Sequence, residues 1–165
     1  MNYRTLLTFI LLALLSWLPT SCDLDIANPN QATEAEVGTS QDGIRNVTVG
    51  IQGLYSTSGL SAIILTPAVT TREMAINTTF ASLIELESGG TALPPENGRT
   101  NRIWNNLFRV IEMSDLVIEN APELITQEGE LSGILATAQI HKAMSLGYLV
   151  QSFEQSPITT GEDVT

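Results

Sequence analysis

The chain has 165 residues, 43% of them hydrophobic, which is enough for one domain of ordinary size with a hydrophobic core. It carries 18 acidic residues against 7 Lys and Arg, giving a formal net charge of -11, and it has no basic run. Binding to nucleic acid needs clustered cations opposite the phosphates, so DNA and RNA are not expected partners. A single cysteine excludes an internal disulfide and a Cys-rich metal site.

The chain begins with an expected export signal and lipid-attachment site. A largely apolar run without charged residues follows Arg4 over residues 6–18. It has the length of a signal-peptide core and is too short to span a bilayer. Small residues then lead to Cys22, whose thiol could carry palmitate-like acyl chains that anchor by apolar burial. Ordinary cleavage, which leaves a free thiol, is the alternative. Bacterial lipoprotein signals usually have Leu three residues before the cysteine, where this chain has Pro19 preceded by Leu18.

These features divide the chain into three parts. Residues 1–21 are predicted to be the lipoprotein signal peptide. Residues 22–32 are predicted to hold the lipidated cysteine and a polar tether, because Asn28-Pro29-Asn30 is poor helix material. Residues 33–165 are expected to form the folded, helical part.

The first helices are expected in the segment that follows the tether. Thr33 and Glu36 have the spacing of a capping box, which predicts a helix start. An apolar stripe predicts a helix that runs to about residue 55, formed by Ile44, Val47, Ile51 and Leu54. Residues 56–61 (STSGLS) predict a break. The segment 62–90 mixes a β-branched run containing Pro67 with a more helical stretch over residues 72–86, so its type is left open. Residues 88–101 are predicted to be a surface loop.

The two clearest helices come last. The first is predicted from residue 103 to about Asn120, on an apolar face made by Ile103, Leu107, Val110, Ser114 and Val117. The second is predicted over residues 130–153, with Pro157 past its end. Only about ten residues join them, so we expect antiparallel neighbours that form an αα-hairpin.

Two adjacent residues are candidates for ligand binding. Trp104 and Asn105 open the strong helix directly after the Gly- and Pro-rich loop, and an aromatic face beside amide groups can hold a sugar ring. The alternative is that Trp104 is a core residue that anchors the helix pair. His141 has no second His or Cys to share a metal ion, so a structural role is expected for it and no metal site is predicted.

The acidic pairs Glu85/Glu87 and Glu128/Glu130 raise the alternative of an exported hydrolase, because glycosidases use two carboxylates across the scissile bond. Chance pairs are expected among 18 acids. The sequence has no phosphate-binding loop, dinucleotide fingerprint, nucleophile elbow or HExxH motif. We therefore expect a protein that is not an enzyme and needs no cofactor.

Three stretches together resemble the SusD/RagB family of nutrient-uptake lipoproteins of the Bacteroidetes outer membrane. They are SCDLDIANPNQATEAEV (21–37), WNNLFRVIEMSDLVIEN (104–120) and AQIHKAMSLGYLVQSFEQSPI (138–158). The family commonly has Asn, Arg and Gly where this chain has Asp115, Lys142 and Glu154. Its members are several times longer, so the chain resembles only their N-terminal portion.

The resemblance implies an all-α fold of tetratricopeptide-like helix pairs, truncated relative to the family. It also implies a lipid-anchored protein of the cell outer membrane, facing the surface, that captures glycans, oligosaccharides or other nutrients. The implied partner is a TonB-dependent transporter, for which such a protein acts as a lid. The alternative is a truncated helical-repeat scaffold that binds no ligand.

Overall fold

The computed structural model describes Tyr3 and residues 37–157. The predictions about Cys22, the tether and the capping box at Thr33 and Glu36 lie outside these residues. Every regular element in the described part is helical, so the fold is all-α, as the sequence predicts.

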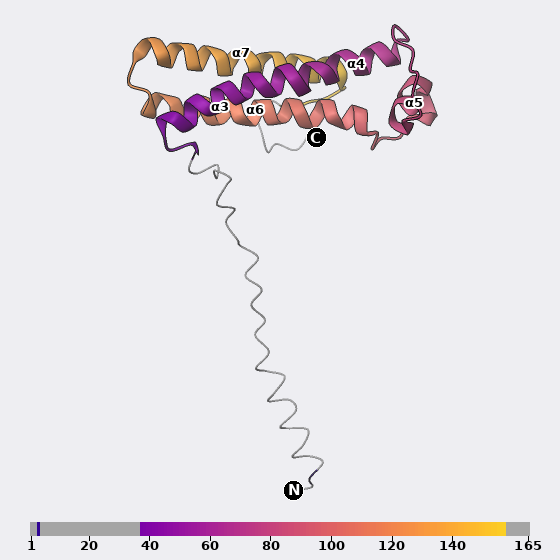
Figure 1. The fold of residues 1–165 in the computed structure, drawn as a ribbon, viewed down its shortest axis with the longest axis horizontal. Helices are drawn as coiled ribbons and strands as arrows, with labels where there is room; N and C mark the ends of the chain where they lie inside the picture. The colour runs from indigo at the N-terminus through magenta and orange to yellow at the C-terminus, as the bar shows by residue number, and fades with distance from the viewer. Residues whose placement is uncertain (1–2, 4–36, 158–165) are drawn as a thin grey trace. The chain divides into compact units, whose positions relative to one another are not determined.

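A long helical rod opens the described part of the chain and comprises α3 (Gln41–Leu54), the π-helix η1 (Tyr55–Gly59) and α4 (Leu60–Thr70). Ser40 caps the rod by accepting a hydrogen bond from the Gly43 N–H at 3.0 Å. The break predicted over residues 56–61 is wrong, because the rod runs through them (Figure 1). Buried Ile51, Tyr55 and Gly59 pack toward the core there, and tertiary packing overrides the weak helix propensity of Ser and Gly.

The segment after α4 is less helical than predicted. Arg72 has a backbone φ of 62°, in the left-handed region, and the chain leaves the helix there. Of the stretch 72–86 only the end is helical, because α5 (Ala81–Ser88) begins after Phe80. A single 3₁₀ turn, η2 (Gly90–Ala92), follows. The second, small apolar cluster, centred on Val69, Leu83 and Leu86, joins α5 to α4.

α6 (Gly98–Leu124) is longer at both ends than predicted. It begins at Gly98 because Asn97 is its N-cap, which shortens the predicted loop of residues 88–101. It continues past Asn120 with Pro122 inside it, although proline removes one helical hydrogen bond. Ala121 and Ile125 are both buried, and the Ile125 N–H bonds to the Ala121 carbonyl at 2.9 Å, so packing holds the last turn.

α7 (Glu128–Ser152) returns alongside α6 and packs against it, which confirms the predicted αα-hairpin (Figure 1). α3 packs on both helices, so the main body is a three-helix bundle with α5 at one end. α6 supplies most of the core, and its predicted apolar face is fully buried at Ile103, Leu107, Val110, Ser114 and Val117. On α7, Ile134, Ala138 and Leu149 are buried, whereas Val150 is exposed.

Within the part of the chain that the structure describes, no helix combines the length and apolarity needed to cross a membrane.

Candidate ligand-binding site

The predicted binding residue Trp104 lies in an aromatic cluster on α6. Its ring is half-buried and contacts Phe108 with ring centroids 4.6 Å apart, and Phe153 meets it edge-on at 5.1 Å. Phe153 is the residue at which α7 ends. Trp104 therefore ties the end of α7 to α6, which favours the packing role that the sequence left open.

Asn105 is exposed on α6, and its neighbour Asn106 has the polar contact instead. The Asn106 side-chain amide donates to the carbonyl oxygen of Ser58 in the π-helix at 3.2 Å. Trp104 and Asn105 thus have different surroundings, and neither residue lines the two hollows described next.

A pocket of about 270 Å³ lies beside this cluster, at the end of the bundle near α5. α4 contributes hydroxyl groups, α5 and the following turn contribute leucines, and the last residues of α7 close the opposite side. The lining residues are Thr66, Pro67, Thr70, Leu86, Leu93, Thr100, Ile103, Gln151, Ser152 and Phe153, none of which is charged. Phe153 is shared by the pocket wall and the Trp104 cluster, so Trp104 supports the pocket from behind.

Asn97 holds the elements around this pocket in place. Its side-chain oxygen accepts from the N–H groups of Arg99 and Thr100 at 2.9 and 3.3 Å and caps α6. Its side-chain nitrogen donates to the Ser82 carbonyl at 3.0 Å and to the Glu85 carboxylate at 2.8 Å, both on α5. Asn97 is only 2% exposed and uses its full hydrogen-bonding capacity. One buried amide thus fixes α5 against the start of α6.

A second hollow, of about 470 Å³, lies over the connection between α4 and α5. Arg72, Ala75, Glu87 and Ser88 line it. Arg72 and Ser88 are exposed there, and Glu87 accepts a hydrogen bond from the Ile76 N–H at 3.3 Å. This hollow lies over a loop, whereas the pocket at the bundle end is uncharged and lies between four helices, so that pocket is the stronger candidate.

The acidic pairs have separate structural contacts. Glu85 bonds to Asn97, and Glu87 bonds to the backbone of Ile76. Glu130 on α7 accepts two hydrogen bonds from the Arg45 guanidinium on α3, at 2.6 and 3.1 Å, whereas Glu128 is exposed. None of these four carboxylates lines the uncharged pocket.

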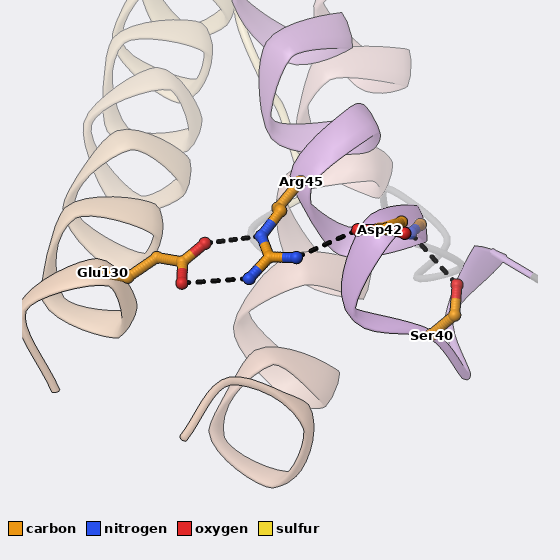
Figure 2. Close-up of polar contacts among 5 residues, drawn as sticks. Ser40, Asp42, Arg45 and Glu130 are labelled. Carbon is orange, nitrogen blue, oxygen red and sulfur yellow. Dashed lines mark hydrogen bonds and ion pairs between the residues drawn. The ribbon is translucent and has the colours of Figure 1, made fainter. Parts of the chain in front are cut away.

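Arg45 links two parts of the bundle that are far apart in the sequence (Figure 2). Besides Glu130, it donates to the Asp42 carboxylate at 2.9 Å. The hydrogen bonds from Arg45 lower the pKa of the Glu130 carboxyl below its usual value, and the same bonds raise the pKa of Arg45. The cluster is a charged clamp between α3 and α7.

His141 is a half-buried residue of α7 that lies beside η1. Its Nδ1 lies 2.8 Å from the Thr137 carbonyl oxygen, and its ring meets Tyr55 edge-on at 5.3 Å. Burial raises the pKa of the Tyr55 hydroxyl. The Tyr55 and Ser145 hydroxyls are buried without hydrogen-bond partners. The described residues contain no group of His, Cys, Asp and Glu suited to a metal ion. The contacts of His141 with Thr137 and Tyr55 favour a structural role for it.

The chain matches no known protein family, no curated protein and no solved structure in direct comparison.

The sequence reasoning missed the residues that build the pocket. Thr66 and Thr70 lie in the segment whose type the sequence left undecided, so their common face could not be assigned. Asn97 carries a usable signal, because Asn before the strongest amphipathic helix is a preferred N-cap. Phe153 stands at the predicted end of the last helix, but the pocket that it closes depends on α4 and α5.

Proposed function

We propose that the protein is a surface lipoprotein that binds nutrients, glycans or oligosaccharides first among them, and partners a TonB-dependent transporter for their uptake. It is anchored in the cell outer membrane through Cys22. The sequence at Cys22 carries the proposal, because an apolar leader, small residues and a sole cysteine coincide there.

The fold supports the proposal at two points. The second resembling stretch, residues 104–120, lies within α6, and most of the third lies within α7. These two helices form an antiparallel pair, as the resemblance implies. The uncharged pocket at the end of the pair offers a place for a small ligand without the chemistry of a hydrolase.

Lipidation is tested by growing the cells that make the protein with radiolabelled palmitate. We expect the wild-type chain to carry label and sediment with membranes. Cys22→Ala is expected to lose both properties, because it removes the acceptor thiol. Ser21→Ala, which keeps a small residue before the cysteine, serves as the matched control and should label normally. If Cys22→Ala labels and stays membrane-bound as well as the wild type does, the anchor is not at Cys22.

The partner is tested by capturing the tagged chain from detergent-solubilised membranes. Mass spectrometry should identify a TonB-dependent transporter at a constant ratio to the chain. Its absence from captures that retain the lipidated chain would contradict the transporter part of the proposal.

A helical scaffold without ligand binding is the second candidate. The outer face of α7 favours it, because Ile140, Met144 and Val150 are 57%, 40% and 66% exposed there. An apolar face of this kind suits packing against another helical element. If the chain captures a transporter but calorimetric titration with glycans releases no heat of binding, the scaffold is the better description of its function.

A further inference from the structure

The hydroxyl of Thr66 differs from those of Thr48 and Ser114, two other buried residues of the bundle. Thr66 is 8% exposed and lines the pocket, yet within the described residues its hydroxyl makes no hydrogen bond. Thr48, 7% exposed, and Ser114, fully buried, each donate to the carbonyl four residues earlier, at 2.8 and 2.7 Å. Because Thr66 lines the pocket, its hydroxyl is available to a ligand that enters there.

Other polar groups of the wall complement Thr66. The Thr70 hydroxyl donates a hydrogen bond to the Thr66 carbonyl at 2.8 Å, and its oxygen can still accept a hydrogen bond from a ligand. Thr100 and Gln151 line the same pocket, and their side chains make no hydrogen bonds within the described part of the chain. The pocket therefore offers both donors and acceptors, all of them neutral.

The remaining wall of the pocket is apolar. Leu86, Leu93 and Ile103 line it, and Phe153 closes it with its ring braced by Trp104. A ligand that fits both walls has an apolar face and a rim of hydroxyl groups. The volume, about 270 Å³, is close to the lower end of the roughly 300–1,000 Å³ usual for ligand pockets, which suits a molecule of one ring.

The charge of the ligand is also restricted. No cation lines the pocket to pair with an acid, and the chain as a whole carries a net charge of -11. A carboxylate would lose its hydration there without gaining a counter-ion. No anion lines the pocket to pair with an amine either.

We infer that this pocket binds a small uncharged polyol the size of one sugar ring, with the Thr66 hydroxyl as a directional hydrogen-bond partner and Phe153 against its apolar face. The inference rests on the nutrient-binding function proposed above and assigns that function a site and a class of ligand.

The test uses the full chain in detergent with ¹³C-labelled threonine methyl groups, titrated with the neutral hexoses glucose, galactose and mannose. Glucuronate and benzene serve as the charged and the purely apolar probes. We expect at least one neutral hexose to shift the methyl signals of Thr66, Thr70 and Thr100 saturably. Glucuronate and benzene should leave them unchanged.

The matched variants are Thr66→Val and Thr48→Val. Thr66→Val should weaken hexose binding about three- to tenfold, because a neutral hydrogen bond is lost. The same variant should unfold at about the same temperature as the wild type, because no hydrogen bond of the Thr66 hydroxyl within the described residues is lost. Thr48→Val, equally buried but away from the pocket, should bind as the wild type does.

Three results would overturn the inference: no shift of these methyl signals with any hexose, equal shifts with glucuronate or benzene, or unchanged hexose affinity in Thr66→Val. If Thr66→Val binds hexose as tightly as the wild type does, the pocket at Thr66 is not the binding site, and the proposed function is unaffected. Failure of the proposed function itself appears separately, as loss of palmitate labelling and of transporter capture in the wild-type chain.

Discussion

At the scale of single residues, Asn97 has the largest structural role. An N-cap usually satisfies one or two backbone N–H groups of its own helix. Asn97 does so for α6 and at the same time binds a carbonyl and a carboxylate of α5, fully shielded from water. The position of α5, and with it two leucines of the pocket wall, depends on this side chain.

Asn97→Ala is predicted to lower the free energy of unfolding by about 2 kcal/mol or more. Loss of a cap alone costs about 1 kcal/mol, and the Ser82 carbonyl and Glu85 carboxylate also lose their partner. Urea titration followed by circular dichroism measures the change.

Asn105→Ala is the matched control for this prediction. Its side chain is exposed on the same helix, so its effect should stay within about 0.5 kcal/mol. Equal stability of the two variants would show that the Asn97 contacts contribute nothing net.

At the scale of elements, the π-helix η1 keeps the buried faces of α3 and α4 on the same side of the rod. Ile51 and Gly59 are both buried and stand eight residues apart, which in a regular α-helix turns the chain by about 800°, roughly 80° past two full turns. The wider π turn absorbs this excess and keeps α3 and α4 facing the core. It also leaves the Ser58 carbonyl to accept from Asn106 on α6.

Deletion of the exposed Thr57 is predicted to convert η1 to regular α-helix with little loss of stability. Seven residues would then separate the two buried positions, a rotation of about 700°, close to two turns. We expect the free energy of unfolding to change by about 1 kcal/mol or less. Thermal melts measured by circular dichroism test this.

Deletion of the exposed Arg109 gives the comparison. α6 has no π turn to absorb the change, so its second half should rotate by about 100° and turn buried residues such as Val110 outward. That variant should lose most of its cooperative unfolding. Equal damage from the two deletions would contradict the proposed role of η1.

The elements also show how far the sequence could predict the fold. The stripe from Ile103 to Val117 is regular, so the helix and its buried face could be read directly. The break expected at residues 56–61 and the end expected at Asn120 were wrong for one reason. Local propensity favours a stop at Ser, Gly and Pro, whereas buried neighbours such as Tyr55 and Ala121 hold the helix together.

The pocket was harder to predict, because it draws on four separate elements. Its hydroxyls lie on α4, in the stretch where β-branched residues and Pro67 hid the helical period. Trp104 could be singled out as important, but its packing beneath Phe153 depends on how α6 and α7 meet.

At the scale of the whole molecule, ion pairs join α7 to both other helices of the bundle. Lys142 on α7 pairs with Asp115 on α6. Arg45 and Glu130 make the corresponding link between α3 and α7 (Figure 2).

The Arg45–Glu130 link predicts a pH-dependent part of the stability of the bundle. Hydrogen bonds from Arg45 lower the pKa of Glu130 in the folded state, relative to about 4.3 in an unfolded chain. Between these two pKa values the unfolded state binds more protons, so stability rises with pH there. The contribution is fully present above about pH 4.3 and is lost as the pH falls through the folded-state value.

Glu130→Gln should therefore be less stable than the wild type at pH 7, by a small amount because the pair is partly exposed to solvent. The difference should shrink toward zero as the pH falls below about 4. Urea titrations of both proteins at pH 7, 4 and 2.5 measure it, and subtraction cancels the titration of the other carboxylates. Glu128→Gln, an exposed neighbour on the same turn, should show no such pH dependence. A difference between Glu130→Gln and wild type that stays constant over this range would mean that the clamp does not depend on the Glu130 charge.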